Sequence, residues 1–202
     1  MSNSREERAE QKREDILDAA LQVFTEKGFH AAGIADIAAK VGIGHGTCYR
    51  YFKNKRDIFD ALVMRTLVSI SRVIDDEPPT TDSLAEYESQ LYRIADQLFG
   101  IFASDPRLGR ILLFEAPAVD PLLQKQFNQA MTLMAGFTRQ YLDNGVQKNF
   151  LRADTDTDVV AKGINAVIFE GIREISCSKT PDKEGKRWIQ QGVPLMLRGI
   201  AA

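Results

Sequence analysis

The chain has 202 residues, 44% hydrophobic and 27% charged, which is enough apolar mass for a core and too much polarity for a membrane protein. Its apolar runs fall far short of the ~20 residues that span a bilayer, and its charged start lacks the apolar centre of a secretory signal, so we expect a cytoplasmic protein with no membrane partner. The net charge of −2 is unevenly spread: residues 1–56 hold 10 Lys and Arg against 8 Asp and Glu, and the remainder holds 16 against 20.

The first predicted elements are three helices within about forty residues. Apolar residues recur at helical spacing over residues 16–24, and Gly28 supplies the stop. The same spacing predicts a short helix over residues 34–41 that ends at Gly42. After a glycine turn, residues 45–52 have room for only about two helical turns.

A longer helix should then connect this head to the rest of the chain. Its apolar positions keep helical period from Lys55 to about Ile74, and Pro78 with Pro79 prevents its continuation. Ser83 followed by Glu86 has the pattern of a capping box and predicts the next helix start.

Four further helices complete the prediction. Asp105 and Asp120 each precede a proline, which favours the first helical position. Another helix should run from about Asp156 to Ser176, and a polar loop over residues 177–185 should precede a last helix that reaches Gly199. The sequence therefore predicts an all-α fold of nine helices with no strand.

The first three helices have the spacing of a helix-turn-helix, whose second short helix enters the major groove of DNA. The glycines at positions 42, 44 and 46 would let the backbone approach DNA, with Gly46 among the contacts. His45 and Thr47 would then face the base edges. An exposed turn residue is the alternative for His45.

Phosphate contacts are expected from the residues that follow. Tyr49 and Tyr51 offer hydroxyl groups, and Lys53 and Lys55 offer positive charge, in a stretch that has no acidic residue between Asp36 and Asp57. The tyrosines could also pack in the core while a hydroxyl reaches a phosphate.

Residues 42–55, GIGHGTCYRYFKNK, resemble the signature of the tetracycline-repressor (TetR) family. The likeness extends upstream and covers roughly residues 12–65. It implies a nine-helix TetR-type fold with a DNA-binding domain at residues 1–54 and a ligand-binding and dimerisation domain at residues 55–202, with helix 55–74 as the connector.

The resemblance also implies roles for single residues. It implies base reading by His45 and Thr47, and phosphate contacts from Thr47, Tyr49, Tyr51 and Lys55. This chain has Gly33 and Gly44 where the family often has hydroxyl residues that cap helices. Because glycine lacks the hydroxyl, we expect fewer capping or phosphate contacts at these two positions.

A ligand cavity among the body helices is a further implication, and apolar walls would suit a hydrophobic small molecule. Most body aromatics must be core. The candidate lining residues are Phe99, Phe102, Phe114, Glu115, Met131, Met134 and Phe169. Glu115 is the candidate for orienting the ligand, with a surface or ion-paired carboxylate as the alternative.

The last two predicted helices carry more apolar surface than a lone surface helix needs. Paired with their symmetry mates they would form a four-helix interface, so we expect a homodimer. The alternative is that both helices cover the core of the monomer.

We therefore expect a repressor that binds a palindromic double-stranded DNA operator and is released by an unidentified small-molecule effector. The alternative is a helix-turn-helix activator or protein-partner adaptor with no such inducer. We expect no enzyme, no catalytic residue, no cofactor and no metal site, because both histidines lie in the head and no Ser or Cys nucleophile has a base nearby. Cys48 and Cys177 lie far apart, as suits a reducing compartment.

Overall fold

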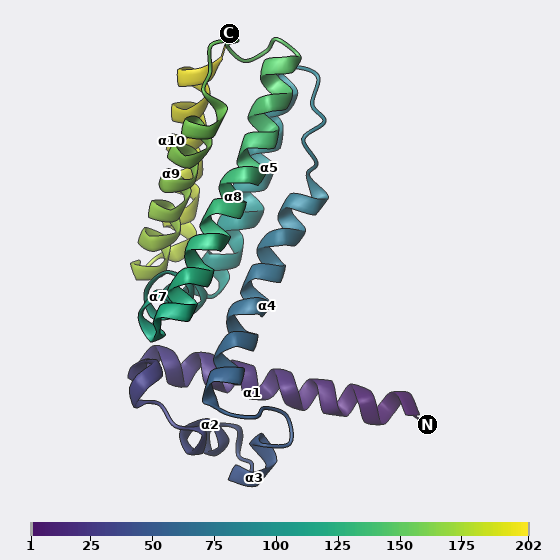
Figure 1. Ribbon diagram of the computed structural model, residues 1–202, viewed down its shortest axis with the longest axis vertical. Helices are drawn as coiled ribbons and strands as arrows, with labels where there is room; N and C mark the ends of the chain where they lie inside the picture. The colour runs from purple at the N-terminus through teal and green to yellow at the C-terminus, as the bar shows by residue number, and fades with distance from the viewer. Residues whose placement is uncertain (1, 202) are drawn as a thin grey trace.

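The computed structural model describes the backbone of residues 2–201 and the side chains of residues 5–201, as an upright helical body above a small head (Figure 1). The head and connector comprise α1 (Ser2–Ala31), α2 (Ile34–Val41), α3 (His45–Cys48) and α4 (Lys55–Asp76). The body comprises α5 (Leu84–Ser104), α6 (Pro106–Arg110), the π-helical turn η1 (Ile111–Glu115), α7 (Ala116–Val119), α8 (Pro121–Gln147), α9 (Thr157–Cys177) and α10 (Pro181–Ile200). With 106–119 counted as one continuous helix, residues 2–201 form nine helices and no strand, which confirms the all-α prediction.

Polar side chains begin the long helices where the sequence predicts. Ser83 Oγ accepts the backbone N–H of Glu86 at 3.3 Å, Asp120 Oδ1 that of Leu123 at 2.9 Å, and Asp156 Oδ1 that of Val159 at 3.1 Å. Each bond satisfies one of the backbone donors that a helix leaves free in its first turn. These caps fix where three of the body helices begin.

The start of the last helix differs from the prediction. The polar loop expected over residues 177–185 is only three residues long, because Pro181 already occupies the first turn of α10. Gly185, expected at the end of that loop, is instead buried inside α10, where a Cβ atom would lie 3.7 Å from Ile175 and 3.8 Å from Phe99. These are ordinary contact distances, so the packing here does not require glycine.

The helix over residues 106–119 contains a local widening that the sequence analysis does not predict. Pro117 has no N–H group to donate to the carbonyl four residues before it, and its ring crowds that carbonyl. The preceding N–H, that of Ala116, bonds to the carbonyl of Ile111, five residues back. The π-helical turn η1 is therefore explained by a proline immediately after it.

The core of the head does not end at the predicted domain boundary. The buried cluster of α1 to α3 continues into Ile58 and Phe59 of α4, and then into Ile111, Ala116 and Val119 of the body. In Figure 1 the segment labelled α7 lies directly above the C-terminal half of α1. The head is thus packed on the body through one shared apolar layer.

Close approach of α6 to α9 gives a first testable prediction. A Cβ atom at Gly109 would overlap Ser176 Oγ and lie 3.1 Å from Ile172. We expect Gly109→Ala to lower the free energy of unfolding by about 1–3 kcal/mol, and Ser176→Ala to recover part of this loss in the double variant. Urea denaturation measures both effects. Gly100→Ala is the control, since nothing lies within 4 Å of that position, and an equal loss there would contradict the packing argument.

Candidate nucleic-acid interface and ligand cavity

A glycine turn positions α3 relative to α2. Gly42 adopts a left-handed conformation with φ 74°, and its N–H bonds to the carbonyls of Ala38 and Ala39. The N–H of Ile43 bonds to the carbonyl of Ala38 at 3.0 Å, which completes a tight helix end. Only glycine adopts such a φ without strain, so this turn depends on Gly42.

The outer side of α3 carries the residues predicted to read bases. His45 and Gly46 are exposed and Thr47 is half-buried. Tyr49, which follows the helix directly, is 50% exposed, and its ring meets the ring of His45 edge-on with centroids 5.1 Å apart. Cys48 faces inward, and burial raises the pKa of its thiol. The helix is therefore anchored by one face and open on the other.

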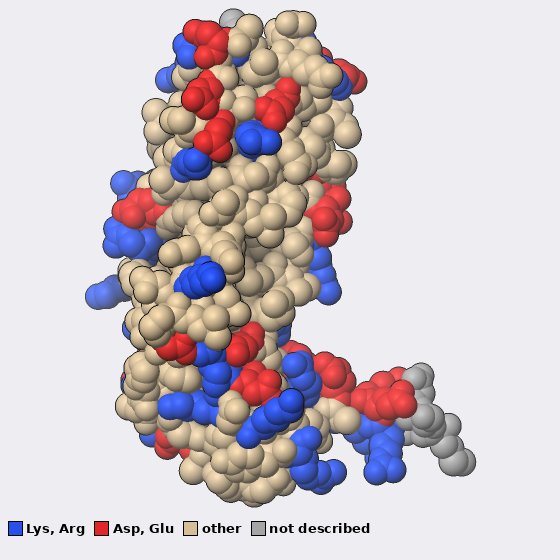
Figure 2. Space-filling model, in the orientation of Figure 1, with Lys and Arg blue, Asp and Glu red and all other residues tan. Residues whose placement is uncertain are grey.

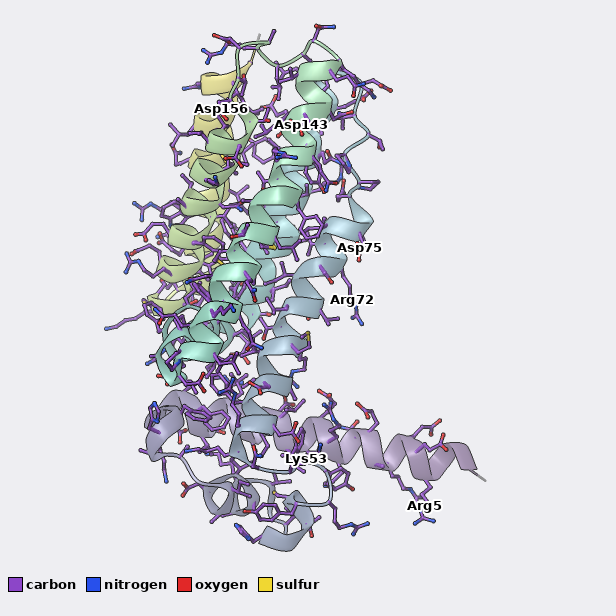
Figure 3. All side chains as sticks on the ribbon, in the orientation of Figure 1. Arg5, Lys53, Arg72, Asp75, Asp143 and Asp156 are labelled. Carbon is purple, nitrogen blue, oxygen red and sulfur yellow. The ribbon has the colours of Figure 1, made fainter. Side chains whose placement is uncertain are left out.

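The predicted phosphate contacts separate into exposed and partly packed residues. Tyr51 is half-buried against the core of the head, and Phe52 is buried with the guanidinium of Arg13 5.1 Å from its ring centre. Lys53 is exposed, and Figure 3 places it in the head between α1 and α3. Figure 2 shows Lys and Arg side chains gathered over the head, with acidic ones among them. Tyr49 and Lys53 are therefore the freer phosphate candidates.

The missing hydroxyl at Gly33 is offset by Asp36, to which the sequence analysis gave no capping role. Gly33 and Gly44 both precede their helices without a side-chain cap. The carboxylate of Asp36 accepts the N–H of Gly33 at 2.9 Å and the ammonium of Lys27 at 2.7 Å. These partners, the lysine first, lower the pKa of Asp36 below its ordinary value. The second half of a capping-box pattern was the available signal.

Lys55 makes a different set of contacts from the predicted one. Its ammonium donates to the carbonyl oxygens of Phe29 at 2.6 Å, His30 at 3.1 Å and Ala32 at 2.8 Å. It also lies 4.5 Å from the centre of the Phe29 ring. An ammonium has three N–H donors, so this geometry leaves none for a phosphate. The phosphate contact stays a prediction, while the observed role is to cap the end of α1.

Glu115 requires a correction. It was expected to orient a ligand, but its Oε2 accepts the N–H of Phe29 at 3.1 Å, outside the cavity described below. The sequence separation is 86 residues, so no local pattern could indicate this contact. The π-helical turn holds Glu115 against the end of α1, where Gly28 has φ 76°. Glu115 and Lys55 therefore satisfy backbone groups at one place, which we call the α1 joint (residues 28–32).

Two arginines of α4 form ion pairs with the head and with the body. Arg65 bonds to Glu14 at 2.7 Å and to Asp18 at 2.8 Å, both on α1. Arg56 pairs with Asp60 on its own helix and with Asp120, the residue that caps α8. Helix α4 is thus attached by side chains both to the head below it and to the body beside it.

A largely enclosed cavity of about 100 Å³ lies inside the body, between α4, α5, α8, α9 and α10. Its walls are almost entirely aliphatic and aromatic, and none of the described residues lining it is charged. Polar side chains on the wall include Thr138, Asn165 and Trp188. Apolar walls with a few polar groups are the usual composition of a small-molecule site.

Three of the predicted lining residues lie on this wall and four do not. Phe99, Met134 and Phe169 line the cavity, and their contact with a ligand stays a prediction. The remaining four are Phe102, Phe114, Glu115 and Met131. Phe102 is fully buried in the adjoining core, Phe114 is 46% exposed, and Met131 is half-buried on α8 outside the lining. Helical spacing predicts which positions are apolar, but it does not predict whether an apolar side chain lines the cavity or packs in the adjoining core.

The described residues include neither a membrane-spanning helix nor a metal-binding group. Across residues 2–201, no helix combines the length and the apolar character needed to cross a bilayer. Among the described side chains, no three His, Cys, Asp or Glu residues are grouped so that they could hold a metal ion.

Comparison with known proteins gives a family for the head and a fold for the whole chain. Residues 16–62 match the family model described as "Bacterial regulatory proteins, tetR family". The "Fatty acid metabolism regulator protein" of Bacillus subtilis is 25% identical over 157 residues, which cover 78% of this chain and 79% of that protein.

Solved structures support the same fold. SmeT bound to triclosan aligns with a TM-score of 0.77 at 22% identity, over 94% of this chain and 91% of that chain. SmeT is described as the repressor of the Stenotrophomonas maltophilia multidrug efflux pump SmeDEF. FadR from Bacillus subtilis in complex with stearoyl-CoA aligns with a TM-score of 0.71 at 22% identity, over 89% and 96% of the two chains.

The neighbouring lysines Lys53 and Lys55 provide a matched pair for a second prediction. Lys55→Ala should lower the free energy of unfolding by about 2 kcal/mol, because three carbonyl oxygens lose a charged donor. Lys53→Ala should leave stability within about 0.5 kcal/mol, because its side chain is exposed to solvent. Thermal and urea unfolding measure this. Equal stability losses in the two variants would contradict the α1 joint.

Proposed function

The chain belongs to the tetR family of bacterial regulatory proteins, and from this premise we propose that it is a repressor that binds a palindromic DNA operator and leaves it when a small apolar ligand enters the body. The observation that carries the proposal is the position of the family match. It covers the helix-turn-helix, whose α3 is anchored by Cys48 and exposes His45 and Tyr49. We place its activity in the cytoplasm, where the DNA is.

In operator binding, base contacts and phosphate contacts would come from different residues of the head. His45 and Thr47 at the start of α3 would reach base edges, while Tyr49 and Lys53 would contact phosphates. The acidic body and the more basic head would favour one orientation on DNA. With few cationic contacts available, operator affinity should fall moderately as salt rises.

A homodimer would use α9 and α10. Val159 on α9 is 62% exposed and Leu195 on α10 is 67% exposed, although both residues are apolar. A two-fold axis through this face would present two copies of α3 to successive major grooves, ~34 Å apart. The palindromic operator in the proposal follows from that symmetry.

Release from the operator would follow from the size of the cavity. Its volume of about 100 Å³ is below the ~300–1,000 Å³ usual for ligand sites, so a larger ligand must move the walls apart. Ile70, Val73 and Ile74 of α4 form part of those walls, and the first residue of the same helix is Lys55 at the α1 joint. A ligand that binds the expanded form better would shift the population towards it. Two structural neighbours hold stearoyl-CoA and triclosan.

DNA binding itself gives the third prediction. In a gel shift on the promoter region upstream of its own coding sequence, the purified protein should form a salt-sensitive complex that resists non-specific competitor DNA. His45→Ala should weaken this complex about tenfold while leaving non-specific binding unchanged, because a base contact carries specificity and a phosphate contact does not. Asn128→Ala, at an exposed site on α8 of the body, is the control. The absence of any sequence-preferring complex would refute the proposal.

Glu115 gives the fourth prediction, on coupling between cavity and head. Glu115→Leu should reduce the ratio of operator affinities without and with ligand by several-fold, because the body loses its hydrogen bond to the α1 joint. The ligand is the compound that releases the complex in a gel-shift screen of apolar compounds. Glu88→Leu, exposed on α5, is the matched control. An unchanged ratio in Glu115→Leu would show that coupling takes another route.

A further inference from the structure

On the cavity wall, the amide of Asn165 has a hydrogen-bond partner for its oxygen but none for its nitrogen among the described residues. Asn165 on α9 is 5% exposed, and its Oδ1 accepts the hydroxyl of Thr138 on α8 at 2.8 Å. Its Nδ2 has no hydrogen-bond partner among the described residues. A buried donor without a partner is unfavourable, so the cavity favours an occupant that supplies an acceptor to this nitrogen.

The orientation of this amide is set by its neighbour. The hydroxyl of Thr138 has two oxygens within reach, Asn165 Oδ1 at 2.8 Å and the carbonyl oxygen of Met134 at 3.2 Å. Its single proton is assigned to the nearer oxygen, which leaves Asn165 Nδ2 as the atom without a partner. No acceptor among the described wall residues lies within hydrogen-bond distance of this nitrogen. Trp188 offers only a donor, and the hydroxyl of Tyr141 is directed to the backbone oxygen of Glu77. The missing acceptor must therefore come from a molecule that enters the cavity.

The charge of that molecule is limited by the same walls. No described lining residue carries a charge, so an ionised ligand would lose its hydration without gaining a counter-ion. Such a transfer is far more costly than burying a neutral carbonyl that receives a hydrogen bond. Carboxylates and ammonium ions are therefore excluded from the interior.

We propose that the effector is an uncharged, mostly apolar molecule with an exposed acceptor oxygen, such as a ketone, ester or ether, that binds Asn165 Nδ2. Thr138 is the positioning residue that holds the amide in this orientation. This inference rests on the proposed function and specifies the ligand class of the same cavity. An engineered cavity of ~150 Å³ accepts benzene, so molecules with one six-membered ring match the present volume with small wall movements.

Trp188 supplies a direct measurement, since it lines the cavity and is the one tryptophan of the sequence. Its fluorescence can be titrated with three probes that share a ring: cyclohexanone, methylcyclohexane and cyclohexanecarboxylate. The wild-type chain should bind the ketone and the hydrocarbon, and should bind the carboxylate at pH 7 at least a hundredfold more weakly than the ketone.

Variants separate the hydrogen bond from the apolar contacts. Asn165→Leu should weaken cyclohexanone binding about five- to tenfold and leave methylcyclohexane binding equal or tighter. Thr138→Val should weaken cyclohexanone binding about two- to threefold, because the amide loses its fixed orientation. Asn128→Leu, the same change at an exposed position of α8, should alter neither probe.

Three outcomes overturn the inference: no binding of any probe, tight binding of the carboxylate, or an equal effect of Asn165→Leu on ketone and hydrocarbon. If Asn165→Leu does not fold, two measurements still test the inference. They are the comparison of ketone with carboxylate in the wild-type chain and the titrations of Thr138→Val. All of these titrations are made without DNA. A chain that binds the ketone as described but never binds an operator would refute the proposed function and leave this inference standing.

Discussion

The end of α1 is the place on which the arrangement of head and body depends. A helix terminus leaves backbone groups without partners, and burial makes their satisfaction obligatory. Gly28 turns the chain with a positive φ, and the carbonyls exposed after it converge on the ammonium of Lys55. The nearby N–H of Phe29 is taken by Glu115. One helix end is thus completed by two other parts of the chain.

This arrangement physically connects the two proposed activities, operator binding by the head and ligand binding in the body cavity. Lys55 begins the same helix whose later residues, Ile70 and Val73, form part of the cavity wall. Glu115 belongs to a segment that is packed against α9, another wall helix, through the close contact of Gly109 with Ser176. Displacement of either wall would therefore reach the α1 joint, and the apolar layer shared with the head would transmit it. Closely packed cores favour discrete alternatives over gradual deformation.

Much of this fold can be predicted from the sequence because its signals are local. Ser83, Asp120 and Asp156 act within three residues of themselves, and Gly42 ends α2 through its own backbone. The helix-turn-helix is also recognisable, since its turn and its exposed residues are contiguous. The widening at η1 had a local signal in Pro117 that helical spacing alone does not reveal.

The rest depends on contacts between distant residues. Lys55 has the charge of a phosphate ligand, and only the position of α1 shows that carbonyl oxygens occupy its donors. Glu115 was assigned to a ligand because it stands among apolar residues, whereas its partner lies 86 residues away. The role of Asn165 likewise requires knowledge of which polar atoms its neighbours leave unpaired. A glycine in a polar stretch, such as Gly185, can lie in a loop or inside a helix, and periodicity does not distinguish the two.

The central claim is that the α1 joint changes when the cavity is filled. Its most direct measurement is hydrogen exchange at the amide of Phe29, compared between the free, ligand-bound and operator-bound protein. The account predicts strong protection in the operator complex and at least a tenfold loss of protection when ligand is bound, with amides in the middle of α9 unchanged. Equal protection of the Phe29 amide in all three states, while ligand still releases the operator, would contradict it.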